Sequence, residues 1–143
     1  MERILLAVED SPAGLAAARA AVYVAASWSA QLRAVHVLVD GVLEGALEQR
    51  PGAVEVRGRR DAGAVAVLRH VAGLAERAGV TAETLALSGS PASCILEQAR
   101  TWPADLVVIG RVGGGRLGQP YVGSEVRHVL EFATVPVLVV PPP

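Results

Sequence analysis

The segment ADLVVIGRVGGGRLGQPYVGSEV, residues 104–126, contains the clearest structural pattern in this chain. Near its start is a short apolar run rich in β-branched residues, which predicts a strand over residues 106–109 that is buried on both faces. A glycine-rich connection follows, and an apolar helical pattern begins after Gly123 and Ser124. A strand, a connection and a helix in that order indicate one unit of a parallel α/β sheet.

The same order of elements recurs along the rest of the chain. Similar apolar runs predict four more strands, over residues 4–8, 32–39, 80–87 and 135–140. Residues 4–8 and 106–109 are apolar on both faces and are expected to be central strands, whereas residues 80–87 alternate with polar residues and are expected at an edge. The prediction is a single domain, residues 1–143, of the α/β class: an open five-stranded parallel sheet, order 3-2-1-4-5, with helices on both faces.

Helix start signals lie between these strands. Ser11 and Ser90 each precede a proline and can act as N-caps, and the other two helices are expected to start at Asp61 and at Gly123-Ser124. Gly79 is the expected stop of the second helix. Residues 40–60 are expected to form a long connection with room for one helical turn near residues 43–49.

Composition excludes several classes of protein. The chain has 143 residues, 52% hydrophobic and 19% charged, which is the composition of a folded globule. All 13 basic residues are arginine, so phosphate binding by a Walker lysine and Schiff-base chemistry are excluded. The net charge of −1 makes nucleic acid an unexpected partner. Interrupted apolar runs predict no membrane segment, and one cysteine without a signal peptide predicts a cytoplasmic location.

No catalytic residue and no metal site are predicted. His36, His70 and His128 lack neighbouring ligands at metal spacing and are assigned structural or surface roles. Cys94 lies in an apolar helical stretch and is expected to be a buried packing residue.

The glycine-rich connection is the candidate binding element. Six glycines lie between residues 110 and 123, and glycine lets backbone N–H groups converge on an anion without a Cβ in the way. Ser124 adds a hydroxyl at a helix N-terminus, which favours negative charge. The predicted strand order reverses between the first and fourth strands, so a ligand crevice is expected outside their carboxyl ends. The alternative is a flexible surface loop.

The spacing Gly110, two residues, Gly113, nine residues, Gly123-Ser124 resembles the nucleotide-binding pattern of universal stress proteins. Residues 3–11, 89–95, 104–110 and 135–140 also look like that family's segments, so the resemblance spans essentially the whole chain. It implies a five-stranded α/β fold, a homodimer, and ATP as a bound ligand without an established turnover reaction.

Site residues are carried over from the resemblance. It implies an adenine site at the main chain of Val37, a nucleoside pocket and a phosphate site. The pocket would comprise Ala7, Val8, Glu9 and Ile109, and the phosphate site Gly110, Arg111, Gly113, Gly123, Ser124, Glu125 and Val126.

Three positions depart from the family pattern. Glu9 replaces the usual aspartate, Val112 stands where the family is often polar or basic, and Glu125 replaces a small apolar residue. A carboxylate at Glu125 suits the helix dipole and would repel a triphosphate. Arg111 and Arg116 could offset that charge or simply be solvated.

The sequence is compatible with three alternative functions. The first is a homodimeric ATP-binding regulatory module of the stress response, with Mg²⁺ as an optional companion of the nucleotide and an unknown regulatory protein partner. Its dimer contact is expected through the last strand, at Val135, Val137 and Val139. The second is a slow Mg²⁺-dependent ATPase or nucleotidyl-transfer enzyme, and the third is a nucleotide-free dimeric interaction protein.

Overall fold

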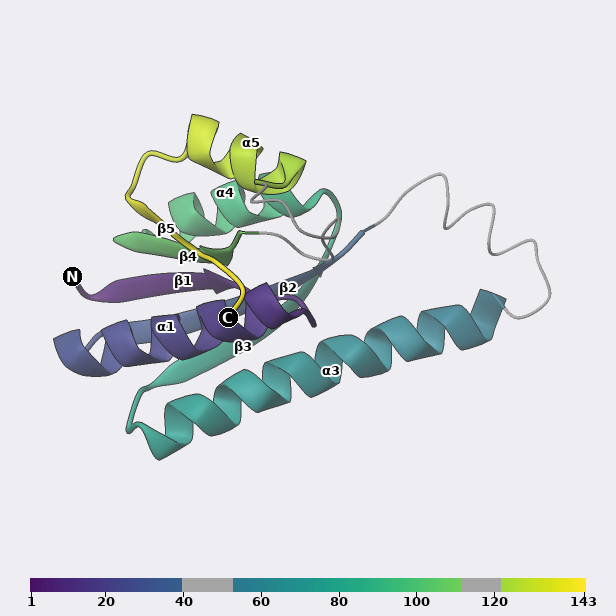
Figure 1. Cartoon of the computed structure of the whole chain (residues 1–143), viewed down its shortest axis with the longest axis horizontal. Coiled ribbons are helices and arrows are strands. Elements are labelled where there is room, and N and C mark those ends of the chain that lie inside the picture. The colour runs from purple at the N-terminus through teal and green to yellow at the C-terminus, as the bar shows by residue number, and fades with distance from the viewer. Residues whose placement is uncertain (40–52, 112–121) are drawn as a thin grey trace.

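The computed structural model describes residues 1–39, 53–111 and 122–143, with the backbone alone for residues 53–61. Strands and helices alternate throughout these ranges (Figure 1). In chain order they are β1 Arg3–Ala7, α1 Pro12–Trp28, β2 Gln31–Leu38, α3 Ala53–Arg77, β3 Ala82–Ser88, α4 Pro91–Thr101, β4 Leu106–Gly110, α5 Ser124–Phe132 and β5 Val137–Val140. Within these ranges, no helix combines the length and the hydropathy that a membrane span requires.

The five strands form one parallel sheet in the order β3-β2-β1-β4-β5, which confirms the predicted fold class. β1 is the central strand, with Leu6 opposite Ala34 of β2 and Val108 of β4. The direction in which successive strands are added to the sheet therefore reverses between β1 and β4, because β2 lies on one side of β1 and β4 on the other.

Two helices cover each face of the sheet, as predicted (Figure 1). Side chains alternate between the faces along a strand, so neighbouring residues of β1 enter different cores. Leu6 packs in the core beneath α1 and α3, while Leu5 packs in the core beneath α4 and α5. Both side chains are fully buried, which explains why this strand is apolar without alternation.

Two predicted helix boundaries are confirmed by their hydrogen bonds. The Ser11 hydroxyl accepts the N–H of Gly14 at 3.0 Å and caps α1. At the other boundary, Gly79 has φ +68° and the N–H of Val80 donates to the Ala75 carbonyl at 2.9 Å, which closes α3 in a Schellman motif.

The start of α3 was predicted wrongly. The helix begins at Ala53, not at Asp61, so residues 53–60 belong to it and not to a connection. Residues 53–60 contain no proline, and their one glycine, Gly58, costs a long helix only about 1 kcal/mol. The turn expected near residues 43–49 lies outside the described ranges. Cys94 is half-buried, not buried, and its Sγ lies 3.7 Å from the Ser88 carbonyl oxygen.

Arg33 fixes α4 against the sheet. Its guanidinium donates from Nε and Nη2 to Glu83 of β3, at 2.9 and 2.7 Å, and from Nη1 to Gln98 of α4 at 3.2 Å. The same group lies 4.6 Å from the ring centroid of Trp102. These contacts hold the C-terminal half of α4 to β2 and β3, so the start of α4 is held at the carboxyl edge of the sheet.

At the amino ends of the strands, the side chain of Asp105 holds the start of β1 beside the start of β4. Its Oδ2 accepts the N–H groups of Glu2 at 2.7 Å and Arg3 at 2.9 Å. These two donors favour the ionised carboxylate and hold the pKa of Asp105 below its ordinary value.

Candidate functional site

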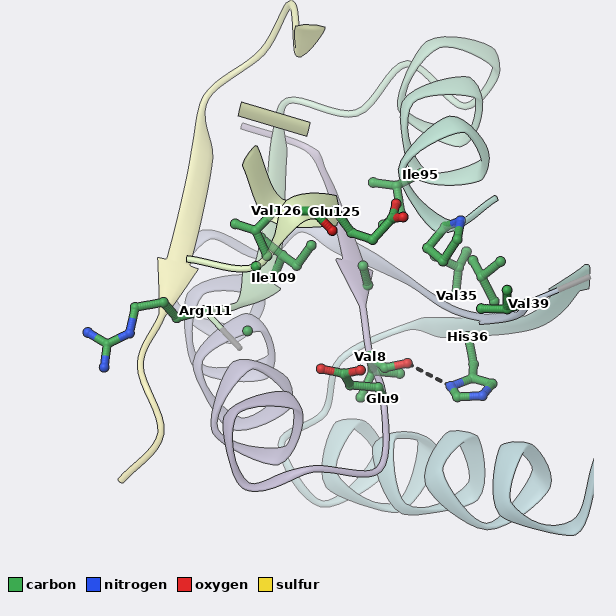
Figure 2. Close-up of a pocket in the computed structure, with 16 residues that line it drawn as sticks. Val8, Glu9, Val35, His36, Val39, Ile95, Ile109, Arg111, Glu125 and Val126 are labelled. Atoms are coloured by element: carbon green, nitrogen blue, oxygen red, sulfur yellow. Dashed lines mark hydrogen bonds between the residues drawn. The ribbon is translucent and has the colours of Figure 1, made fainter. Parts of the chain in front are cut away.

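A cavity of about 260 Å³ opens at the carboxyl edge of the sheet (Figure 2). Its walls come from the ends of β1, β2 and β4 and from the first residues of α4 and α5. This is where the strand order reverses, so the cavity lies at the predicted crevice.

The site residues predicted from the sequence come together here, apart from Gly113, which lies outside the described ranges. The predicted residues on the cavity wall are Ala7, Val8, Glu9, Val37, Ile109, Gly110, Arg111, Gly123, Ser124, Glu125 and Val126. The structure adds five residues that the sequence did not mark: Val35, His36, Val39, Pro91 and Ile95. Val35 could have been found from the two-residue period of β2, which places it on the same face as Val37.

The backbone of Val37 faces the cavity side of β2. Hydrogen-bonding groups of successive residues in a parallel strand point alternately to the two neighbouring strands. The Val35 carbonyl accepts the N–H of Val8, toward β1, and the Leu38 carbonyl accepts the N–H of Gly89, beyond β3. The N–H and C=O of Val37 therefore point toward β1, which has already ended at Ala7.

His36 is oriented by the end of β1. Its Nδ1 lies 2.8 Å from the Val8 carbonyl oxygen (Figure 2). A carbonyl can only accept, so Nδ1 carries the hydrogen. The hydrogen bond gives the ring a structural role beside the cavity. Across the part of the chain that the structure describes, no group of three or more metal-ligating side chains is present.

Packing explains the glycine at position 110 but not the one at position 123. A Cβ on Gly110 would lie 2.8 Å from the carbonyl carbon of Ala13, so Gly110 lets β4 approach the first turn of α1. Gly123 has φ −62°, which any residue adopts, and a Cβ there would meet no described atom within 4 Å. Neither packing nor backbone conformation in the described structure requires glycine at position 123.

The first turn of α5 opens on the cavity. Gly123 is the N-cap, and no side chain in the described ranges caps this turn. The Gly123 N–H is directed to the Arg111 carbonyl at 3.4 Å, and the Gly123 carbonyl accepts the first helical hydrogen bond, from Arg127. The N–H groups of residues 124–126 are thus those that a helix leaves without an intrahelical partner, at the positive end of its dipole.

The charges on the cavity wall differ from the expectation for a phosphate site. Glu9 and Glu125 both line the cavity. The Glu125 Oε2 accepts the N–H of Ala92 at 2.7 Å, and Glu9 Oε1 accepts the Ser11 hydroxyl at 3.3 Å. Arg111 lines the wall, but its side chain points away from both carboxylates (Figure 2) and its Nε is buried. In this structure the Arg111 side chain does not offset their charge.

Comparisons with known proteins identify a matching family and structures with the same fold. Residues 1–141 match the model of the universal stress protein family. Universal stress protein MJ0531 of Methanocaldococcus jannaschii is 31% identical over 147 residues, which cover 99% of this chain and 83% of that protein.

Two solved structures are similar over nearly their whole length. One is a universal stress protein in complex with cAMP, with a TM-score of 0.73, 23% identity, and 99% of this chain and 98% of that chain covered. The other is the universal stress protein of Archaeoglobus fulgidus in complex with dAMP, with a TM-score of 0.69, 21% identity and 98% of both chains covered. At these identities the likeness is one of fold. With the family match over residues 1–141, the chain belongs to the universal stress protein family.

Proposed function

We propose that this chain is a regulatory module of the stress response that binds an adenine nucleotide, with ATP among its ligands. The observation that carries the proposal is the uncapped first turn of α5, which opens on a cavity at the reversal of strand order and begins at a glycine that the described structure does not itself require. Backbone N–H groups and a helix dipole at such a place favour a phosphate. The cAMP and dAMP complexes of proteins with the same fold support an adenine nucleotide as the ligand.

The base would be read by the main chain of Val37. Its N–H and C=O face the cavity side of β2 as an adjacent donor and acceptor, and the amino group of adenine suits a carbonyl acceptor where guanine presents an oxygen. The cavity walls nearby are apolar, with Val35 and Ile95 on the same side of the sheet. Mg²⁺, if carried by the phosphates, would meet Glu9 as a carboxylate on the wall.

A competition titration tests the base assignment. ATP is expected to bind at least about tenfold more tightly than GTP, since guanine would place an oxygen against the Val37 carbonyl. Isothermal calorimetry with both nucleotides measures the ratio. Equal affinity for GTP would contradict an adenine site, and no binding of either nucleotide would contradict the proposed function.

The nucleotide would act on a homodimer formed through β5. This strand is the last of the sheet, its outer edge has no neighbouring strand in the described chain, and Leu138 is 37% exposed. An uncovered apolar edge invites pairing with a second copy. An unknown protein partner would read the nucleotide state of this dimer, and the cytoplasmic location stays a prediction from the sequence.

Light scattering at micromolar concentration is expected to give the mass of a dimer. Val139→Asp should give a monomer, because it places a charge on the proposed pairing strand; Val137 begins β5, and Val135, also predicted at the contact, lies just before it. Val65→Asp, which places the same charge at a half-exposed position on α3, is the control for added charge away from β5 and should remain a dimer. A wild-type monomer, or a folded Val139→Asp variant that is still a dimer, would contradict pairing through β5.

A further inference from the structure

Glu125 connects the N-termini of two helices at the cavity. It is the second residue of α5, and its Oε2 accepts the N–H of Ala92 in the first turn of α4 at 2.7 Å. Ser90, the N-cap residue of α4, makes no side-chain capping hydrogen bond, so the local sequence of α4 does not satisfy that N–H. Glu125 therefore caps α4 from another helix.

This contact holds a negative charge on the cavity wall. An exposed glutamate can ordinarily swing away from an approaching anion at little cost. Here such a movement would break a charge-assisted hydrogen bond and leave the N–H of Ala92 without its acceptor. In Figure 2 the Glu125 side chain reaches from α5 toward α4, while the Arg111 side chain points away from it.

The main chain of Glu125 belongs to the same first turn of α5 that carries the proposed phosphate site. A phosphate bound to these N–H groups would lie near a carboxylate that is tied to α4, and the repulsion would rise with each added phosphate. An uncharged nucleoside in the same cavity would not experience it.

We propose that Glu125 is a specificity-determining residue that makes this site favour adenine ligands with fewer phosphates. The inference rests on the proposed function and concerns which adenine ligand the site prefers. It depends on the bond between Glu125 and Ala92, which keeps the charge in place.

Glu125→Gln isolates the charge, because the amide oxygen can still accept the N–H of Ala92. Wild type and variant are titrated by calorimetry with adenosine, AMP and ATP at low ionic strength without divalent cations. Affinity for ATP is expected to rise about tenfold in the variant, affinity for AMP by less, and affinity for adenosine not at all. The gain should shrink in 1 M salt, where the screening length falls to about 3 Å.

Glu125→Ala provides a second measurement. It removes both the charge and the cap of α4, so it should bind ATP more tightly than wild type and melt at a lower temperature than Glu125→Gln. Equal changes for adenosine, AMP and ATP, or no change in the ratio of their affinities, would overturn the role of Glu125. Failure of wild type and variant to bind any of the three ligands would instead overturn the proposed function, and the inference with it.

Discussion

Replacing Gly14 by alanine is expected to lower the free energy of unfolding by about 3 kcal/mol, at the upper end of typical overpacking costs. The added Cβ would overlap the backbone carbonyl oxygen of Glu9. That carbonyl also accepts the N–H of Ser11 at 2.9 Å, and the Ser11 hydroxyl in turn accepts the N–H of Gly14. The atom that the added Cβ would meet is therefore a hydrogen-bonded backbone oxygen and not the end of a flexible side chain. The backbone of the turn between β1 and α1 must shift to make room. Urea denaturation followed by circular dichroism measures the loss.

Gly63→Ala is the matched control for this substitution. Gly63 lies inside α3, and a Cβ there would meet no described atom within 4 Å. Alanine should therefore stabilise the chain by about 0.8–1 kcal/mol through helix propensity alone. A loss at Gly14 of less than about 1 kcal/mol would show that the turn yields readily, contrary to its close packing.

Replacing Gly123 by valine is expected to weaken ATP binding at least tenfold, which is about 1.4 kcal/mol, while the chain still folds. The branched side chain would occupy the open space at the first turn of α5, where the phosphate is proposed to lie. Its cost to folding should be small because φ at this position is −62°. Calorimetric titration measures the affinity, and circular dichroism checks the fold.

Two further measurements test whether the effect of Gly123→Val is specific to the phosphates. Adenosine has no phosphate, so its affinity should change far less than that of ATP in the Gly123→Val variant. Ser124→Ala should cost about 1 kcal/mol of ATP binding, since it removes one hydroxyl and leaves the main-chain donors in place. Unchanged ATP affinity in folded Gly123→Val would move the phosphates away from α5 and favour the nucleotide-free interaction protein.

The sequence alone determined the order of the sheet and the place of the cavity. Residues 4–8 and 106–109 are apolar on both faces, and such a pattern depends only on neighbouring residues, so central strands could be assigned without a structure. Once these two strands are central, the reversal of strand order locates the crevice at their carboxyl ends. The start of α3 was missed because residues 53–60 lack a strong local helix signal.

The roles of individual residues at that cavity depend on how distant segments pack. Glu125 and Ala92 are 33 positions apart, and only the packing of α5 beside α4 brings the carboxylate to that N–H. Gly110 looked like part of a phosphate loop, but its contact with Ala13 gives it a packing role. The orientation of the Arg111 side chain likewise could not be predicted from the residues next to it in the sequence. Periodicity and capping are local properties that a sequence carries, whereas hydrogen bonds and close approaches between distant segments exist only after the chain has packed.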